Sequence, residues 1–101
     1  MRAFRLHDHS TPPSVDETNL LSPGKGEIRV KIFACGLNFA DLLMARGSYQ
    51  AIPPLPATLG LEPAGLIDAV GPDVTGLAVG DRVAVRSGHG GMAEYGVFRA
   101  I

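Results

Sequence analysis

Apolar and polar side chains alternate most regularly between Glu27 and Ala34. Residues on one face of a β-strand recur at every second position, so this alternation is typical of a strand that buries one face and exposes the other. The apolar set would face the core and the charged set the solvent: Ile28, Val30, Ile32 and Ala34 against Glu27, Arg29 and Lys31. The pattern predicts a half-buried strand over residues 27–34.

Shorter apolar runs predict further strands on both sides of this one. Their ranges are 2–6, 15–21, 64–70, 83–85 and 93–98. The run 64–70 is apolar on both faces, which is expected of a strand covered on both sides. Glycine and proline mark turns between the runs, at 22–24, 71–73 and 80–81. We interpret the glycine-rich segment 88–91 as a hairpin connection between the last two strands.

The period changes after Ala34, where the spacing becomes helical. The apolar positions that would form one face of the helix are Phe39, Leu42 and Leu43. Asn38 stands where an N-cap residue would, and Asp41, three residues later, can complete an arrangement like a capping box. Gly47 is typical of the residue just beyond a helix end. These signals predict a short helix over 38–46, followed by an extended, proline-rich connection at 53–56.

Together these elements predict a mainly β (α+β) domain with one short helix, arranged as a partly open β-barrel. Thirteen glycines and eight prolines favour short strands over long helices. No internal repeat or linker divides the 101 residues, which indicates one domain or part of one. Because the sequence stops directly after a strand-like run, we expect the chain to be a fragment of a longer protein.

Composition and charge narrow the classes of function. Ten acidic and nine basic residues are interspersed and give a formal net charge of −1, so the sequence has neither a basic stripe for nucleic acid nor an acidic tail. No apolar run has the length of a signal peptide or a membrane span. Cys35 is the single cysteine, which excludes an internal disulfide and a multi-cysteine zinc site. We expect a cytoplasmic protein without membrane or nucleic-acid partners, whose function depends on a local site.

Five short motifs follow one another in an order that resembles a known family. They are Ala34-Cys35-Gly36-Leu37-Asn38-Phe39-Ala40-Asp41, Gly47-Ser48-Tyr49 with Pro53-Pro54-Leu55-Pro56, Gly60-Leu61-Glu62-Pro63-Ala64-Gly65, Val70-Gly71 to Val74 with Gly80-Asp81-Arg82-Val83, and Gly91-Met92-Ala93-Glu94-Tyr95. This series is similar to that of the zeta-crystallin-like quinone oxidoreductases in the medium-chain dehydrogenase/reductase superfamily. Each motif is weak alone, and the shared order makes the resemblance specific.

This resemblance implies a fold and a partner domain. The chain looks like the GroES-like catalytic domain, also called the alcohol dehydrogenase N-terminal domain, over residues 1–101. In the family a Rossmann domain follows, supplies most contacts to NADPH and often forms the dimer interface. The resemblance therefore implies a homodimer for the intact protein. Because the Rossmann domain is absent from these residues, we expect this chain alone to bind NADPH weakly or not at all.

Departures from the zinc-dependent branch of the superfamily indicate the chemistry. That branch has a cysteine in place of Asn38 and a histidine in place of Leu61, and neither an asparagine amide nor a leucine is a usual zinc ligand. Without a Lewis acid, reduction of a plain ketone loses its main means of stabilising the developing alkoxide. Quinones and α,β-unsaturated carbonyls delocalise the incoming charge themselves. The resemblance therefore implies zinc-free hydride transfer from NADPH to such a small molecule.

Two residues are candidates for contact with the reactants. Asn38 resembles a family position beside the nicotinamide, where its amide can bind a carbonyl or a hydroxyl group of cofactor or substrate; the alternative role is a plain N-cap. Tyr49 matches a family tyrosine near the substrate pocket, whose hydroxyl could bind an oxygen acceptor. The alternative for Tyr49 is a half-buried aromatic residue whose hydroxyl reaches solvent.

Three further residues are candidates for lining the substrate pocket. Leu43 stands where some quinone oxidoreductases have a pocket tyrosine. Leu61 either lines the pocket or packs in the core. Glu62 is either a partly buried acid that tunes the site or a carboxylate satisfied by backbone donors or an arginine, and we favour the second. Asp41 is interpreted as a capping partner and not as a catalytic acid.

Two alternative functions remain open at this point. One is an enoyl reductase of the same superfamily, and the other is a non-catalytic GroES-like or crystallin-type protein. A formal match of residues 88–93 to the dinucleotide fingerprint G-x-G-x-x-A is rejected, because that fingerprint requires a following helix and an acidic residue about 20 positions later.

Overall fold

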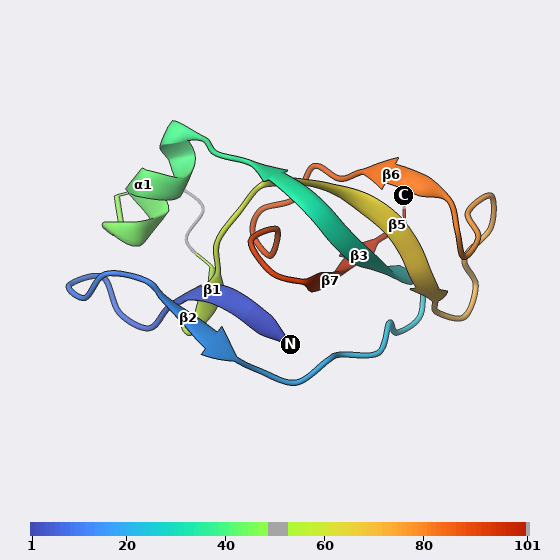
Figure 1. Cartoon of the computed structure of the whole chain (residues 1–101), viewed down its shortest axis with the longest axis horizontal. Coiled ribbons are helices and arrows are strands. Elements are labelled where there is room, and N and C mark those ends of the chain that lie inside the picture. The colour runs from blue at the N-terminus through green and yellow to red at the C-terminus, as the bar shows by residue number, and fades with distance from the viewer. Residues whose placement is uncertain (49–52, 101) are drawn as a thin grey trace.

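Two antiparallel sheets and one helix make up the described part of the molecule (Figure 1). The computed structural model describes residues 1–48 and 53–100. The smaller sheet has the order β2-β1-β4, with β1 Arg2–Leu6, β2 Ser14–Glu17 and β4 Ala57–Thr58. The larger has the order β6-β5-β3-β7, with β3 Glu27–Gly36, β5 Glu62–Val70, β6 Arg82–Ala84 and β7 Tyr95–Arg99. The predicted mainly β class with one short helix is confirmed, and the described sheets do not close into a full barrel.

Strand β3 is the centre of the larger sheet, because it pairs with β5 on one side and β7 on the other. Its predicted apolar face is confirmed at Ile28 and Val30, which are buried with Ile67 and Phe98. Further along, Ile32 is half-buried and Ala34 is exposed. Register shifts in the pairing with β5 interrupt the alternation there, since a bulge changes which face a following side chain occupies.

The predicted strand at 15–21 is shorter than expected. It covers only Ser14–Glu17, and Leu20 and Leu21 are exposed. Its partner β1 begins at Arg2, which pairs with Glu17, so the residues beyond Thr18 have no neighbouring strand. The two-residue strand β4 was not predicted, because it follows a proline-rich stretch that gives no alternating pattern.

The interpretation of residues 88–91 as a hairpin connection is wrong. Strands β6 and β7 lie at opposite edges of the larger sheet. The connection instead runs beside the end of the smaller sheet, where the N–H groups of Gly90, Gly91 and Met92 donate to the carbonyls of Thr58, Gly60 and Leu59 at 2.8, 2.9 and 2.7 Å. A Cβ atom at Gly91 would lie 2.8 Å from Cys35 Sγ, so glycine permits this close approach. We call this pairing of 90–92 with 58–60 the inter-sheet joint.

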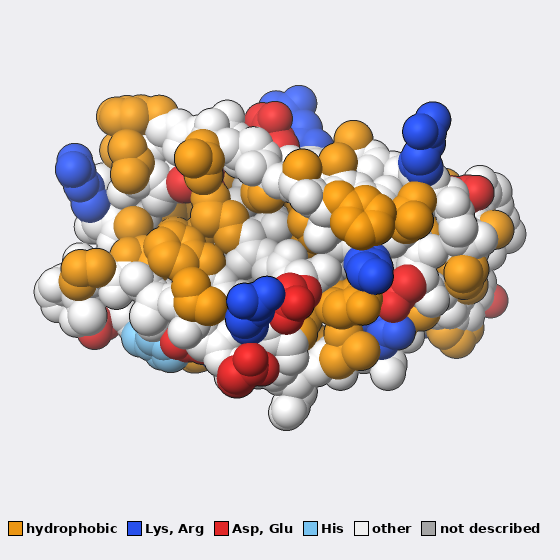
Figure 2. Space-filling view, in the orientation of Figure 1, with side chains coloured by type: hydrophobic (Ala, Val, Ile, Leu, Met, Phe, Trp, Pro, Cys, Tyr) orange, Lys and Arg blue, Asp and Glu red, His pale blue; other side chains and the backbone are white. Residues whose placement is uncertain are grey.

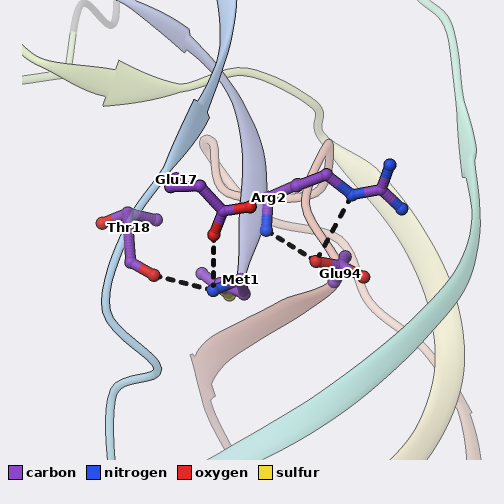
Figure 3. A network of polar contacts seen from close by, with 5 residues as sticks. All are labelled: Met1, Arg2, Glu17, Thr18 and Glu94. Atoms are coloured by element: carbon purple, nitrogen blue, oxygen red, sulfur yellow. Dashed lines mark hydrogen bonds and ion pairs between the residues drawn. The ribbon is translucent and has the colours of Figure 1, made fainter.

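The start of the chain is tied to both sheets (Figure 3). The Met1 amino group donates to the Thr18 carbonyl at 2.8 Å and pairs with Glu17 at 3.4 Å. The Arg2 N–H donates to Glu94 Oε1 at 2.6 Å, and the Glu94 N–H donates back to the Arg2 carbonyl at 3.0 Å. The Arg2 N–H also lowers the pKa of the Glu94 carboxyl group. These contacts connect β1 and β2 with the segment that precedes β7.

Helix α1 (Phe39–Ala45) follows β3 directly, with Asn38 as N-cap and Arg46 as C-cap. This agrees with the predicted helix at 38–46. The predicted apolar face is wrong in detail, because Phe39 and Leu42 are exposed while Asp41 and Met44 are buried. Met44 packs with Leu6 and Leu59, so the helix docks through the face next to the expected one. No helix within residues 1–48 and 53–100 has the length and apolar character needed to cross a membrane.

A substitution at Gly65 tests how closely β5 packs against β3 in the larger sheet. Gly65 pairs with Ile32 of β3, and a Cβ atom there would collide with the main-chain oxygen of Lys31. We expect Gly65→Ala to lower the free energy of unfolding by about 1–3 kcal/mol, because the strand must shift to make room. Gly88→Ala is the matched control, since its Cβ would meet open space, and we expect a change within about 0.5 kcal/mol. Urea denaturation measures both, and equal stability of the two variants would contradict this account.

Candidate functional site

The junction between β3 and α1 lies against the turn between β4 and β5. Asp41 joins the two segments: its Oδ2 accepts a hydrogen bond from the Asn38 N–H at 3.0 Å, and its Oδ1 accepts one from the Gly60 N–H at 3.1 Å. Asp41 is only 6% exposed and is the one charged side chain in the buried class among the described residues. The fold thereby brings Asn38 and the segment that contains Leu61 into one region.

Asn38 has an unusual side-chain environment. Its backbone is extended, as expected at an N-cap, with φ −129° and ψ 154°. Within the described residues its amide nitrogen, Nδ2, is buried and has no hydrogen-bond partner. A buried donor without a partner costs about 1–3 kcal/mol. The donor therefore has no acceptor among the described residues, and it belongs to a residue that lines the groove described next.

An apolar groove of about 520 Å³ lies along the beginning of α1. One wall comes from the β3–α1 junction and α1, and the other from residues distant in sequence; the lining includes Leu37, Asn38, Phe39, Leu42, Phe4, Leu59 and Met92. This volume lies within the usual range of small-molecule sites, about 300–1,000 Å³. Among the described residues that line it, Asn38 and Asp41 are the only polar ones.

Large apolar side chains remain exposed at this groove. Leu37, Phe39 and Leu42 are 83%, 70% and 54% exposed. Figure 2 shows hydrophobic side chains gathered over the part of the molecule that α1 occupies in Figure 1. Such a concentration of exposed apolar surface is typical of a binding groove or an interface.

The other predicted pocket residues lie in different environments. Leu43 is half-buried in α1 and is absent from the groove lining. Leu61 is half-buried and packs against the core cluster of Leu6, Met44 and Leu59, which corresponds to the core-packing alternative. Tyr49 lies outside the described residues.

Glu62 differs from both roles considered for it. Its side chain is exposed, whereas the next residue of β5, Pro63, is buried. Because neighbouring strand residues face opposite sides, burial of Pro63 turns Glu62 toward solvent. Within residues 1–48 and 53–100 its carboxylate has neither a hydrogen bond nor an ion pair, so the expected backbone or arginine partner is not found there.

Cys35 lies near the end of β3, three residues before Asn38, and its thiol is not activated. It is half-buried, and burial raises the pKa of the thiol above its usual value. The thiol is therefore protonated at neutral pH and is a poor nucleophile. Across the described part of the chain, no group of three or more His, Cys, Asp or Glu side chains is placed to hold a metal ion.

Sequence reasoning missed two features of this site. The bridge from Asp41 to Gly60 spans 19 positions, and only the capping-box spacing gave a sign that Asp41 accepts hydrogen bonds. The far wall of the groove, with Phe4, Leu59 and Met92, depends on the inter-sheet joint. No local sequence pattern predicts the pairing of residues 58–60 with residues 90–92, because the two segments are far apart in the chain.

Comparison with known proteins agrees with this architecture. The family model of the alcohol dehydrogenase GroES-like domain matches residues 24–100. Quinone oxidoreductase-like protein 2 of Mus musculus is 43% identical over 93 residues, which cover 92% of this chain and 27% of that protein. The synaptic vesicle membrane protein VAT-1 homolog of Homo sapiens is 48% identical over 69 residues, which cover 68% of this chain and 18% of that protein.

Solved structures resemble the fold closely. The Escherichia coli quinone oxidoreductase complexed with NADPH superposes with a TM-score of 0.90 and 31% identity, over 99% of this chain and 31% of that one. A probable oxidoreductase from Mycobacterium abscessus also gives a TM-score of 0.90, with 28% identity, over 99% of this chain and 32% of that one. The chain thus spans less than a third of the length of these relatives. By its matched residues and its strand arrangement, the chain belongs to the alcohol dehydrogenase GroES-like domain family, among the quinone oxidoreductase-like members of the medium-chain dehydrogenase/reductase superfamily.

Proposed function

We propose that this chain is the substrate-side domain of an oxidoreductase that transfers hydride from NADPH to a quinone or an α,β-unsaturated carbonyl compound without zinc. The observation that carries the proposal is the buried Asn38 Nδ2, which has no hydrogen-bond partner among the described residues and belongs to a residue that lines an apolar groove. Relatives named as quinone oxidoreductases, one of them complexed with NADPH, support the same chemistry.

The residues of the groove fit these reactants. An amide N–H donates to a carbonyl oxygen, and both the nicotinamide carboxamide and the acceptor contain one. Asn38 would hold such an oxygen, while Leu37, Phe39 and Leu42 would cover flat apolar rings and exclude water. When bound, NADPH supplies the hydride; the protein contributes binding and orientation.

The donor set also favours an acceptor that needs no Lewis acid. By the resemblance to the zinc-dependent branch, Asn38 and Leu61 stand where that branch has two zinc ligands, and neither side chain is a usual zinc ligand. A quinone or an enone spreads the incoming negative charge over its own conjugated system. Donation from Asn38 to its carbonyl oxygen would then add stabilisation where the charge develops. Tyr49 remains a candidate for a second contact to that oxygen.

The nucleotide phosphates would bind outside these 101 residues. The glycine-rich segment 88–93 is no phosphate cradle, because the N–H groups of Gly90, Gly91 and Met92 donate to carbonyls of the inter-sheet joint. We therefore place most NADPH contacts on a Rossmann domain that closes over the groove in the intact protein. The proposal includes a homodimer of that protein and a cytoplasmic location.

The first test concerns the separation of the acceptor site, on this chain, from most NADPH contacts, on the Rossmann domain. We expect the natural full-length polypeptide that contains this chain to oxidise NADPH in the presence of a quinone or an enone, which is followed by the loss of NADPH absorbance. The ratio of the two rates distinguishes a quinone reductase from an enoyl reductase. The 101-residue chain alone should show no micromolar binding of NADPH in isothermal titration calorimetry. Micromolar binding by the chain alone would contradict the proposal.

The second test separates the two roles of Asn38. Asn38→Ser retains a good N-cap residue but lacks the amide donor, so we expect kcat/KM to fall about 5- to 150-fold, equivalent to the loss of a hydrogen bond of about 1–3 kcal/mol. The free energy of unfolding should not fall, because serine is a good N-cap residue and the substitution removes a buried donor that costs about 1–3 kcal/mol. Asn19→Ser is the matched control, because Asn19 is exposed. Full activity of Asn38→Ser would leave Asn38 with the capping role alone.

A further inference from the structure

We propose that Asp41 is a positioning residue, whose carboxylate holds Asn38 in register with the opposite wall of the groove. The inference rests on the proposed function, because Asn38 is the residue that it positions. It assigns to Asp41 more than the capping role expected from its spacing.

The geometry distinguishes a bridge from a cap. Capping of α1 uses Oδ2, which accepts from the Asn38 N–H at 3.0 Å within the same turn. The other oxygen, Oδ1, accepts from the Gly60 N–H at 3.1 Å, and Gly60 belongs to the segment that follows β4. One rigid carboxylate thus fixes the distance between two main-chain N–H groups on opposite sides of the site.

Burial of a charge at this point requires an explanation. An ionised carboxylate is expensive to bury unless hydrogen bonds compensate it, and Asp41 is only 6% exposed. Packing of α1 does not require a charge, since Met44 already fills the core on that side of the helix. The carboxylate instead accepts hydrogen bonds from two N–H groups, those of Asn38 and Gly60. A hydrogen bond to an ionised acceptor is stronger than one between neutral groups.

The Gly60 segment is held from both sides. The Gly60 carbonyl accepts from the Gly91 N–H of the inter-sheet joint at 2.9 Å, while the Gly60 N–H depends on Asp41. Leu59, the preceding residue, lines the groove with Met92. Asp41 therefore couples the position of Asn38 to the joint, and loss of one oxygen should let the two walls move relative to each other.

The substitution Asp41→Asn tests this coupling in the natural full-length polypeptide. It replaces one acceptor oxygen by an NH₂ group that faces an N–H donor. We expect kcat to fall about 10- to 100-fold through misplacement of Asn38, while KM for NADPH changes less than about twofold because the nucleotide is held elsewhere. A purely structural role would lower the melting temperature and leave kcat per folded molecule unchanged, and that result would overturn the proposal.

Asp81→Asn is the matched control. Asp81 Oδ2 also accepts from a backbone N–H, that of Ala78 at 2.9 Å, but Asp81 is exposed in the turn before β6. The same atom exchange there should leave kcat unchanged. An equal loss of kcat in both variants would contradict a specific role for Asp41.

A measurement of amide exchange separates the bridge from the proposed function. With ¹⁵N labelling, Asp41→Asn should speed hydrogen exchange at the Asn38 amide, the Gly60 amide or both, because both N–H groups donate to this carboxylate. The Gly71 amide, which donates to the Glu27 carbonyl, serves as internal control. Unchanged exchange at both Asn38 and Gly60 would overturn the bridge. If instead the full-length protein reduces no acceptor and the exchange at these amides is faster, the proposed function fails while the bridge stands.

Discussion

Main-chain hydrogen bonds between residues 58–60 and 90–92 join the two sheets, and the site depends on this joint. Strand β1 adds further contacts to the same segment: the Phe4 N–H donates to the Met92 carbonyl at 2.8 Å, Ala3 forms a bridge with Ala93, and Arg2 exchanges hydrogen bonds with Glu94. The joint holds Leu59 and Met92 as one wall of the groove and fixes the Gly60 carbonyl. From Gly60 the connection continues through Asp41 to Asn38. A single chain of hydrogen bonds thus links the architecture to the proposed chemistry.

The groove leaves apolar side chains exposed and a buried polar donor without a partner among the described residues. Leu37, Phe39 and Leu42 stay largely exposed, and the Asn38 amide nitrogen is buried without a partner in the described residues. Each arrangement is unfavourable in a domain that works alone, because apolar surface and polar donors are both left unsatisfied. A ligand with an apolar ring and a carbonyl oxygen would satisfy both at once. This shared requirement is the reason for treating the groove and Asn38 as one site.

The sequence predicted features that depend on local periodicity or local turn chemistry. The alternation at 27–34 identified β3, and Asn38 with Gly47 marked the two ends of α1. It failed where a distant segment decides the outcome. Strand β2 stops where β1 offers no partner, and residues 88–91 pair with 58–60 and not with their own neighbours. The buried face of α1 was misjudged because two N–H groups, one of them from Gly60, compensate Asp41. Alternation with Pro63 explains why Glu62 faces solvent.

The inter-sheet joint uses main-chain atoms only. Side chains at its positions are therefore not required to hold the sheets together, provided that glycine is kept at 60, 90 and 91, where a positive φ or a close approach requires it. Met92 is half-buried, unbranched and flexible, and it lines the groove from this joint. Its side chain also packs against the core cluster of Leu6, Met44 and Leu59. A substitution at position 92 can therefore reshape the groove only with an apolar side chain that still fills the space beside this cluster.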